Sequence, residues 1–307
     1  MTSSPDGSVV SIPVNVIRGL SDGLALLIVA GAHGDEHEGP TSLISLWEGL
    51  RPEDLRGTVI MVPVLNAPAF RASRRWSLED DVDLNRNFPG DPKGTLTHRI
   101  ARVFCDQILG EADFVLSMHG WTAGYLVEPY VEFPGSAATG PAAYAAARAF
   151  GLGLLNPLDA GPGRLMTVAS DRGIPLIEVE IGGQSSTLGD RRRLYEVGTR
   201  NLLVHLDQID GEREEPPAPV HVGRNERVAP AGGLLRPVVA VGDQVAEGQT
   251  LATLHDLNLR LLARATSPAT GVVGVLRLCA STLAGQLVAT VFSPSDWTPP
   301  APGTEPR

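Results

Sequence analysis

The chain has 307 residues, of which 43% are hydrophobic, and its formal net charge at pH 7 is -10. This length can supply one large domain and a smaller one, whereas the negative charge argues against nucleic acid and anionic membranes as partners. The two cysteines, Cys105 and Cys279, lack metal-type spacing, and no leader pattern or long apolar run is present, so we expect a cytoplasmic protein.

Apolar runs of strand length alternate with helical patterns along the first two-thirds of the chain. This alternation predicts an α/β fold, with a mostly parallel or mixed sheet flanked by helices. In chain order the predicted elements are a strand at 24–30, a helix at 41–50, a strand at 59–65, a helix at 97–109, a strand at 114–118, a helix at 141–150, a strand at 175–181 and a helix at 191–209.

The composition changes after the last predicted helix. Residues 211–220 are rich in charge and proline, which is typical of a linker. Short β-like runs with glycines follow, such as 238–254, and they predict a smaller all-β domain. We therefore expect an α/β domain over 1–213, a C-terminal β domain over 220–295 and a disordered tail over 296–307.

Residue types that bind metals follow two of the predicted strands. His33 and Glu36 lie three residues apart in AGAHGDEHEG, just after the strand at 24–30, and His119 directly follows the strand at 114–118. Ligands collect at the carboxyl edge of such sheets, so these side chains should converge. Two histidines and one carboxylate with an open fourth position form a recurring catalytic zinc set. The alternative is a chance HxxE pair with ordinary surface or core histidines.

Two further segments place polar side chains near this edge. Asn85 and Arg86 precede a Phe-Pro-Gly turn in 81–90, and the planar donor fork of an arginine suits a substrate carboxylate. Either residue alone could be an ordinary loop residue. Glu178 and Glu180 interrupt an apolar strand-like run, and a buried carboxylate near a metal is expected to be functional because its burial is costly. Both share one strand face by parity, so the pattern does not choose between them.

Taken in order, these segments resemble the succinylglutamate desuccinylase/aspartoacylase family of zinc deacylases, which is similar to the zinc carboxypeptidases. The resemblance covers the chain almost end to end. It is carried by AGAHGDEHEG, NAPAFRASRRWSLEDDVDLNRNFPG, FVLSMHG, VEIGG and GLLRPVVAVGDQVAEGQTLATLHD. Within the family, the segments FRASRR and NFPGDPKGT are most similar to the acetyl-diaminobutyrate deacetylase-like branch.

The resemblance implies a metal site and a catalytic glutamate. One zinc ion per chain would be held by His33, Glu36 and His119. The segment VEIGG fits the family's catalytic-glutamate motif, which selects Glu180 over Glu178 as general base and general acid.

The resemblance also implies residues that bind the substrate. Asn85 and Arg86 would bind the substrate carboxylate. Arg75 takes the place of the arginine that polarises the scissile carbonyl, with Arg74 directly beside it. Trp121 would either form an aromatic wall beside the metal or pack against the neighbouring strand.

The chain departs from the family pattern close to the third metal ligand. Relatives usually place an aspartate two residues before it, whereas here Ser117 precedes His119. Loss of a carboxylate that orients a ligand typically costs roughly 10- to 100-fold in affinity or activity. Activity is still expected, with the identity of the substrate left open.

These inferences favour a zinc amidohydrolase that removes an acyl group from an N-acylated amino acid with a free carboxylate, acting either as a single chain or as a homo-oligomer. The alternatives are a metallocarboxypeptidase for short peptides, which needs an open cleft, and a non-catalytic ligand-binding homologue. The predicted β domain resembles lipoyl or biotinyl carrier domains, but a carrier needs a modifiable lysine and Lys93 is the only lysine. We expect that domain to narrow the mouth of the site or to form a subunit contact.

Overall fold

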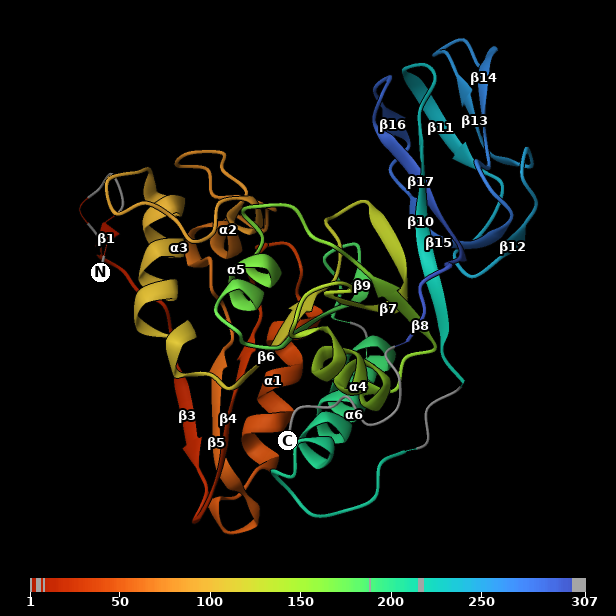
Figure 1. Ribbon diagram of the computed structural model, residues 1–307. Helices are drawn as coiled ribbons and strands as arrows, with labels where there is room; N and C mark the ends of the chain where they lie inside the picture. Colours follow the sequence, from red (N-terminus) through yellow and green to blue (C-terminus); the bar gives the residue numbers. More distant parts are fainter. Residues whose placement is uncertain (1, 4–6, 8, 188, 215–217, 300–307) are drawn as a thin grey trace.

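The fold is built on one large mixed sheet with helices on both faces (Figure 1). It is seen in a computed structural model that describes residues 2–3, 7, 9–187, 189–214 and 218–299. Part of the expected linker, at 215–217, and most of the expected tail, at 300–307, lie outside the described residues.

The described residues form short and long strands and six α-helices. The strands are β1 (Thr2–Ser3), β2 (Val9–Val10), β3 (Asn15–Arg18), β4 (Ser21–Val29), β5 (Arg56–Val62), β6 (Phe114–His119), β7 (Tyr125–Phe133), β8 (Leu154–Pro157), β9 (Leu176–Gly183), β10 (Val220–Val228), β11 (Gly233–Pro237), β12 (Gln244–Val245), β13 (Thr250–His255), β14 (Leu261–Thr266), β15 (Gly271–Arg277), β16 (Ser281–Thr282) and β17 (Leu287–Pro294). The helices are α1 (Glu38–Gly49), α2 (Ala67–Ala72), α3 (Leu96–Gln107), α4 (Gly140–Phe150), α5 (Leu165–Asp171) and α6 (Gly189–His205). Across the described residues, no helix has both the length and the apolar content that a membrane crossing requires.

The central strands of the large sheet are buried on both faces, in keeping with the apolar residues that dominate β6 and the C-terminal half of β4. Helices α1, α4 and α6 cover one face, where Phe150 and Tyr195 join the core. Helices α3 and α5 cover the other face, where Phe104 and Met166 are fully buried (Figure 1). Full burial of each such side chain contributes about 1.5–3 kcal/mol.

The register of three parallel strands brings the polar residues of the sequence to one edge. Strands β4 and β6 pair Val29 with Ser117. Strands β6 and β9 pair Ser117 with Glu178 and His119 with Glu180. Because residues two apart share a face, both glutamates lie on the same side of the sheet as the third predicted metal ligand.

The C-terminal segment contributes to two sheets. Strands β14, β13, β11 and β16 form a separate four-stranded sheet, drawn in blue and cyan at the upper right of Figure 1. Strands β10, β12, β15 and β17 instead continue the large sheet, since β10 pairs with β8 and β15 pairs with β7. A C-terminal β region is therefore present, and the division of the chain into domains at 213–220 stays a prediction.

The pairings close five strands into a ring. Backbone hydrogen bonds run from β7 to β8, β10, β17, β15 and back to β7. Tyr130 and Phe292 meet within one buried cluster on these strands, with ring centroids 4.9 Å apart.

The described start of the expected tail is anchored to the fold. The ring centroid of Trp297 lies 5.1 Å from that of Phe133, and its Nε1 donates a hydrogen bond to the carbonyl of Gly135.

Candidate active site

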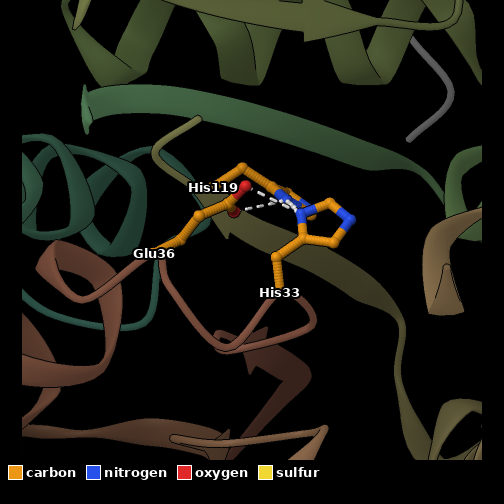
Figure 2. Close-up of side chains that lie close together, drawn as sticks. All are labelled: His33, Glu36 and His119. Atoms are coloured by element: carbon orange, nitrogen blue, oxygen red, sulfur yellow. Dashed lines mark hydrogen bonds and ion pairs between the residues drawn. The ribbon is translucent and has the colours of Figure 1, made fainter. Parts of the chain in front are cut away.

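Three side chains predicted to bind a metal converge at the carboxyl edge of the sheet. His33 and Glu36 come from the loop between β4 and α1, and His119 is the last residue of β6. All three are buried, and their possible ligand atoms lie within 4.8 Å of one another. The Glu36 carboxylate lies 2.8 Å from His33 Nδ1 and 3.0 Å from His119 Nδ1, and Figure 2 shows it against both rings.

The arrangement of these donors suits a divalent cation. The Nδ1 atoms of His33 and His119 face each other at 3.3 Å. When the hydrogen of each imidazole is on Nε2, both Nδ1 lone pairs point toward one another and toward the Glu36 carboxylate, and a cation between them satisfies all three groups. Burial alone would lower the pKa of His119, but the charges of Glu178 and Glu36 outweigh it and raise the pKa to about 10. The site therefore attracts positive charge, and its two nitrogens and one carboxylate match the ligand preference of zinc.

The outer nitrogen of each histidine also has a partner. His33 Nε2 lies 3.2 Å from Asp83 Oδ1, and His119 Nε2 lies 3.1 Å from Ser117 Oγ. Burial alone would raise the pKa of Asp83, but the hydrogen bond with His33 and the charge of Arg75 hold it far below its ordinary value. Such contacts fix the tautomer and the orientation of a metal-binding imidazole. Asp83 lies in the same segment as Asn85 and Arg86, but its place beside His33 was not predicted from the sequence.

The two glutamates of β9 differ in their partners. Glu178 accepts a hydrogen bond from Asn85 Nδ2 at 3.3 Å and lies 3.7 Å from Arg164 Nη1. Glu180 is half-buried, and its Oε2 atom has no hydrogen-bond partner among the described residues. Burial and the nearby charges of Glu36 and other glutamates raise the pKa of Glu180 well above its ordinary 4.5, although His119 opposes this. Of the two glutamates, Glu180 is therefore the one with a carboxyl oxygen that the described residues leave unbonded.

The predicted arginines and Asn85 take up different positions. Arg75 is held by Asp83 through Nε at 3.0 Å, and its Nη1 lies 3.8 Å from Glu36, whereas the neighbouring Arg74 is exposed. The Asn85 side chain is engaged with the protein, because its Oδ1 accepts from the backbone N–H of Leu165 and its Nδ2 donates to a glutamate. One amide hydrogen of Asn85 remains for a ligand.

Arg86 is exposed and makes no ion pair among the described residues. Its Nη1 donates to the backbone carbonyl of Asn85 at 2.6 Å. Burial of part of the side chain and the charge of Arg164 lower the pKa of Arg86. A guanidinium that sits beside other cations, with no carboxylate of its own, is available to an anionic ligand.

These side chains surround a cavity of about 280 Å³. Trp121 lines it, with its Nε1 donating to the Tyr130 hydroxyl at 3.4 Å and Arg224 stacked 5.4 Å from its ring centroid. The C-terminal segment completes the wall with Arg224 and Glu226 of β10 and Leu287 of β17. A larger hollow of about 600 Å³ lies between β3 and α3, but its lining is mostly apolar and contains none of the predicted site residues.

A buried glutamate on β7 organises two arginines of the cavity. Glu132 accepts hydrogen bonds from Arg224 at 2.9 Å and from Arg164 at 3.3 Å. None of these three residues was predicted from the sequence to belong to the site. Glu132 carried a usable signal, since it interrupts an apolar run in the same way as the two glutamates of β9; the arginines carried none, because they lie far apart in the sequence.

The chain is similar to several known proteins. Residues 22–206 match the family model described as the succinylglutamate desuccinylase/aspartoacylase catalytic domain. An N-alpha-acetyl-L-2,4-diaminobutyric acid deacetylase of Halomonas elongata is 33% identical over 297 residues, covering 92% of this chain and 85% of the relative. The product-bound structure of the ectoine utilization protein EutE (DoeB) from Ruegeria pomeroyi is 30% identical, with a TM-score of 0.89, covering 95% of this chain and 92% of that one.

A succinylglutamate desuccinylase/aspartoacylase structure from Rhodobacter sphaeroides is 29% identical, with a TM-score of 0.88, and covers 96% of this chain and 92% of its own. Deacetylases and desuccinylases are hydrolases that act on amide bonds, and the chain is an enzyme of this class. It belongs to the succinylglutamate desuccinylase/aspartoacylase family. The family and the α/β fold expected from the sequence are thereby confirmed.

Proposed function

We propose that the protein is a zinc-dependent amidohydrolase that removes an acyl group from an N-acylated amino acid. The observation that carries this proposal is that the cluster of His33, Glu36 and His119 shares one cavity with Glu180, whose Oε2 atom has no hydrogen-bond partner in the described part of the chain. A metal-binding set and a free carboxylate at one site are the two parts that hydrolysis of an amide by activated water requires.

Each part has a separate task. Zinc held by His33, Glu36 and His119 would supply a Lewis acid that acidifies a water molecule and polarises a carbonyl group. Glu180 accepts a proton from the water as its oxygen bonds to the amide carbon. The same carboxyl group then gives that proton to the leaving nitrogen as the C–N bond breaks, which yields a carboxylic acid and a free amine.

The arginines supply charge and orientation. Arg75 lies beside Glu36 and is fixed by Asp83, so its guanidinium is placed to stabilise negative charge that develops on the carbonyl oxygen. Arg86 binds the substrate carboxylate through two parallel hydrogen bonds, and the remaining amide hydrogen of Asn85 assists it. Trp121 forms a flat apolar wall of the same cavity.

The size of the cavity favours a small substrate. At about 280 Å³ it lies at the lower end of ligand sites, and β10 and β17 wall off one side. A metallocarboxypeptidase would need an opening on that side to admit the rest of a peptide chain. The closed side therefore argues against this activity. N-acetyl and N-succinyl amino acids fit the space and agree with the name of the Halomonas elongata relative, a deacetylase of an acetylated diamino acid.

We also infer that the enzyme meets this substrate as a free small molecule in the cytoplasm. Cys105 is buried, Cys279 is partly buried, and both are unpaired thiols. Unpaired cysteines are typical of a reducing compartment.

The test is to incubate zinc-loaded protein with a panel of N-acetyl and N-succinyl amino acids and short peptides and to detect the released amine. We expect release from one or more N-acyl amino acids and none from peptides. Glu180→Gln, which keeps the shape of the side chain, serves as the control for contaminating activity. Cleavage of peptides alone would identify a carboxypeptidase, and zinc binding without any turnover would identify a non-catalytic homologue.

A further inference from the structure

The outer nitrogen of His119 faces two oxygen atoms that come from different strands. Ser117 Oγ on β6 lies 3.1 Å from His119 Nε2, and Glu178 Oε2 on β9 lies 3.7 Å from it. The parallel register places Ser117 directly beside Glu178. A carboxylate therefore reaches this histidine from the neighbouring strand, although the residue of its own strand is a serine.

The other histidine of the cluster shows what such a carboxylate does. His33 Nε2 lies 3.2 Å from Asp83 Oδ1, so its N–H can donate to a charged acceptor. A carboxylate behind a metal-binding imidazole fixes its tautomer and raises its basicity. The Ser117 hydroxyl can accept the hydrogen from His119, but a neutral oxygen does not supply the negative charge.

Glu178 is itself held in place. Its side chain is 3% exposed, Asn85 Nδ2 donates to it at 3.3 Å and Arg164 Nη1 lies 3.7 Å away. A buried carboxylate is stabilised only when such partners surround it. These contacts direct one of its oxygen atoms at His119, in contrast to Glu180, whose Oε2 atom has no partner among the described residues.

We propose that Glu178 is a positioning residue of the metal centre, which holds His119 from the adjacent strand and supplies the negative charge that Ser117 lacks. The inference rests on the proposed zinc site. It assigns Glu178, the first of the two glutamates of β9, a task distinct from the proton transfer proposed for Glu180.

The first test compares zinc dissociation constants, measured by competition with a chromophoric chelator, for the wild type, Glu178→Gln and Glu196→Gln. Glu196 is the control because it is a partly buried carboxylate that pairs with an arginine, Arg192, and it lies on α6 outside the cavity. Glu178→Gln should weaken zinc binding by about 10- to 100-fold, whereas Glu196→Gln should change it by less than about threefold. Equal affinity for the wild type and Glu178→Gln would overturn the proposal.

The second test asks whether a carboxylate on β6 can replace the carboxylate removed from β9. Adding Ser117→Asp to Glu178→Gln returns a carboxylate to the His119 side of the sheet, so most of the lost zinc affinity should come back. The absorption spectrum of the cobalt-loaded double variant should likewise return toward that of the wild type. A role confined to the ion pair with Arg164 predicts no rescue, and failure of the rescue would count against the positioning role.

Glu178→Asp provides a variant for the case in which Glu178→Gln does not fold. It keeps a negative charge beside Arg164 but withdraws the carboxylate from His119 by one methylene group, so zinc affinity should still fall. Unchanged affinity in Glu178→Asp would contradict the proposal. If the wild type itself binds no zinc, the proposed function fails, and that result is distinct from tight binding that survives both substitutions.

Discussion

Asp83 joins the proposed metal-binding cluster to the candidate catalytic arginine, because its carboxylate lies 3.2 Å from His33 Nε2 and 2.9 Å from Arg75 Nη2. One carboxylate thus contacts both a proposed metal ligand and the arginine proposed to face the substrate. Removal of its charge should disturb both at once.

Asp83→Asn should therefore weaken zinc binding by about 10- to 100-fold and lower kcat at saturating zinc as well. Zinc dissociation constants and initial rates measure the two effects separately. Asp81→Asn, an exposed aspartate of the same loop, is the control and should leave both quantities unchanged. If Asp83→Asn keeps wild-type zinc affinity, the contact with His33 does not orient a metal ligand.

We expect about one zinc ion per chain in the purified protein, since the cluster offers one set of two imidazoles and one carboxylate. His33→Ala and His119→Ala should each lose the metal, as measured by elemental analysis after dialysis. His255→Ala, which removes a histidine of β13 outside the cavity, should retain it. Full zinc occupancy in both site variants would show that the metal is bound elsewhere.

Glu180→Gln should reduce turnover by about 10²- to 10⁴-fold, which is the range for loss of a general base, while zinc stays bound. Glu178→Gln should be much milder when zinc is saturating, because its contacts are with the protein. Both rates are measured with the same N-acyl amino acid. The reverse order would mean that the proton-transferring carboxylate is on Glu178.

Arg86→Lys should impair hydrolysis of N-acyl amino acids strongly, because an ammonium group cannot form two parallel hydrogen bonds to a carboxylate. Amidated substrates, which lack that carboxylate, should be poor for the wild type and lose little more in the variant. The values of kcat/KM for acid and amide substrates in both proteins form a double-mutant-style cycle. Equal losses on both substrates would indicate a structural role for Arg86.

Asp80 should make stability depend on acid pH. It accepts hydrogen bonds from Ser77, Thr95 and the N–H of Thr97, which tie its loop to the start of α3. Burial alone would raise the pKa of Asp80, but these hydrogen bonds outweigh it and lower the pKa below the ordinary 3.8. The folded state therefore favours the carboxylate, so this stabilisation is complete above pH 3.8 and is lost as pH falls through the lowered pKa.

Asp80→Asn should accordingly reduce the free energy of unfolding by about 1–2 kcal/mol at neutral pH, and by less in acid. Urea unfolding of both proteins at neutral and acid pH measures the difference. Glu79→Gln changes an exposed neighbour and should have no such effect. If Asp80→Asn reduces the free energy of unfolding by the same amount at neutral and acid pH, the charge of Asp80 does not contribute to stability.

The sequence predicted the elements with strong periodicity. The strand at 24–30 corresponds to β4, the helix at 97–109 to α3 and the strand at 114–118 to β6. Strand β7 was missed because Pro129 and two glutamates interrupt its apolar pattern, and the pairing of β7 with β9 is irregular between Val127 and Tyr130. Helix α5 and strand β8 are too short for a period to be recognised.

The candidate site was predictable where a motif kept its residues close in sequence. His33 and Glu36 share one loop, and His119 ends a strand that the pattern had found. The partners Arg164 and Arg224 reach the cavity from distant elements, so only the tertiary fold brings them to Glu132. The difference between the two glutamates of β9 likewise depends on contacts across the sheet, which a single sequence does not contain.

The closed ring of β7, β8, β10, β17 and β15 determines how molecules can enter and leave the cavity. Two bodies joined by a flexible segment can open by rotation about a hinge. Here any such rotation would break a continuous ladder of backbone hydrogen bonds. On this side the cavity is bordered by Arg224, Glu226 and Leu287. Arg224 is held by Glu132, whereas Glu226 is exposed, and an exposed side chain changes rotamer in picoseconds to nanoseconds, far faster than domain motion. We therefore expect this wall to adjust to a ligand through side chains such as Glu226 and not through rotation of the C-terminal strands.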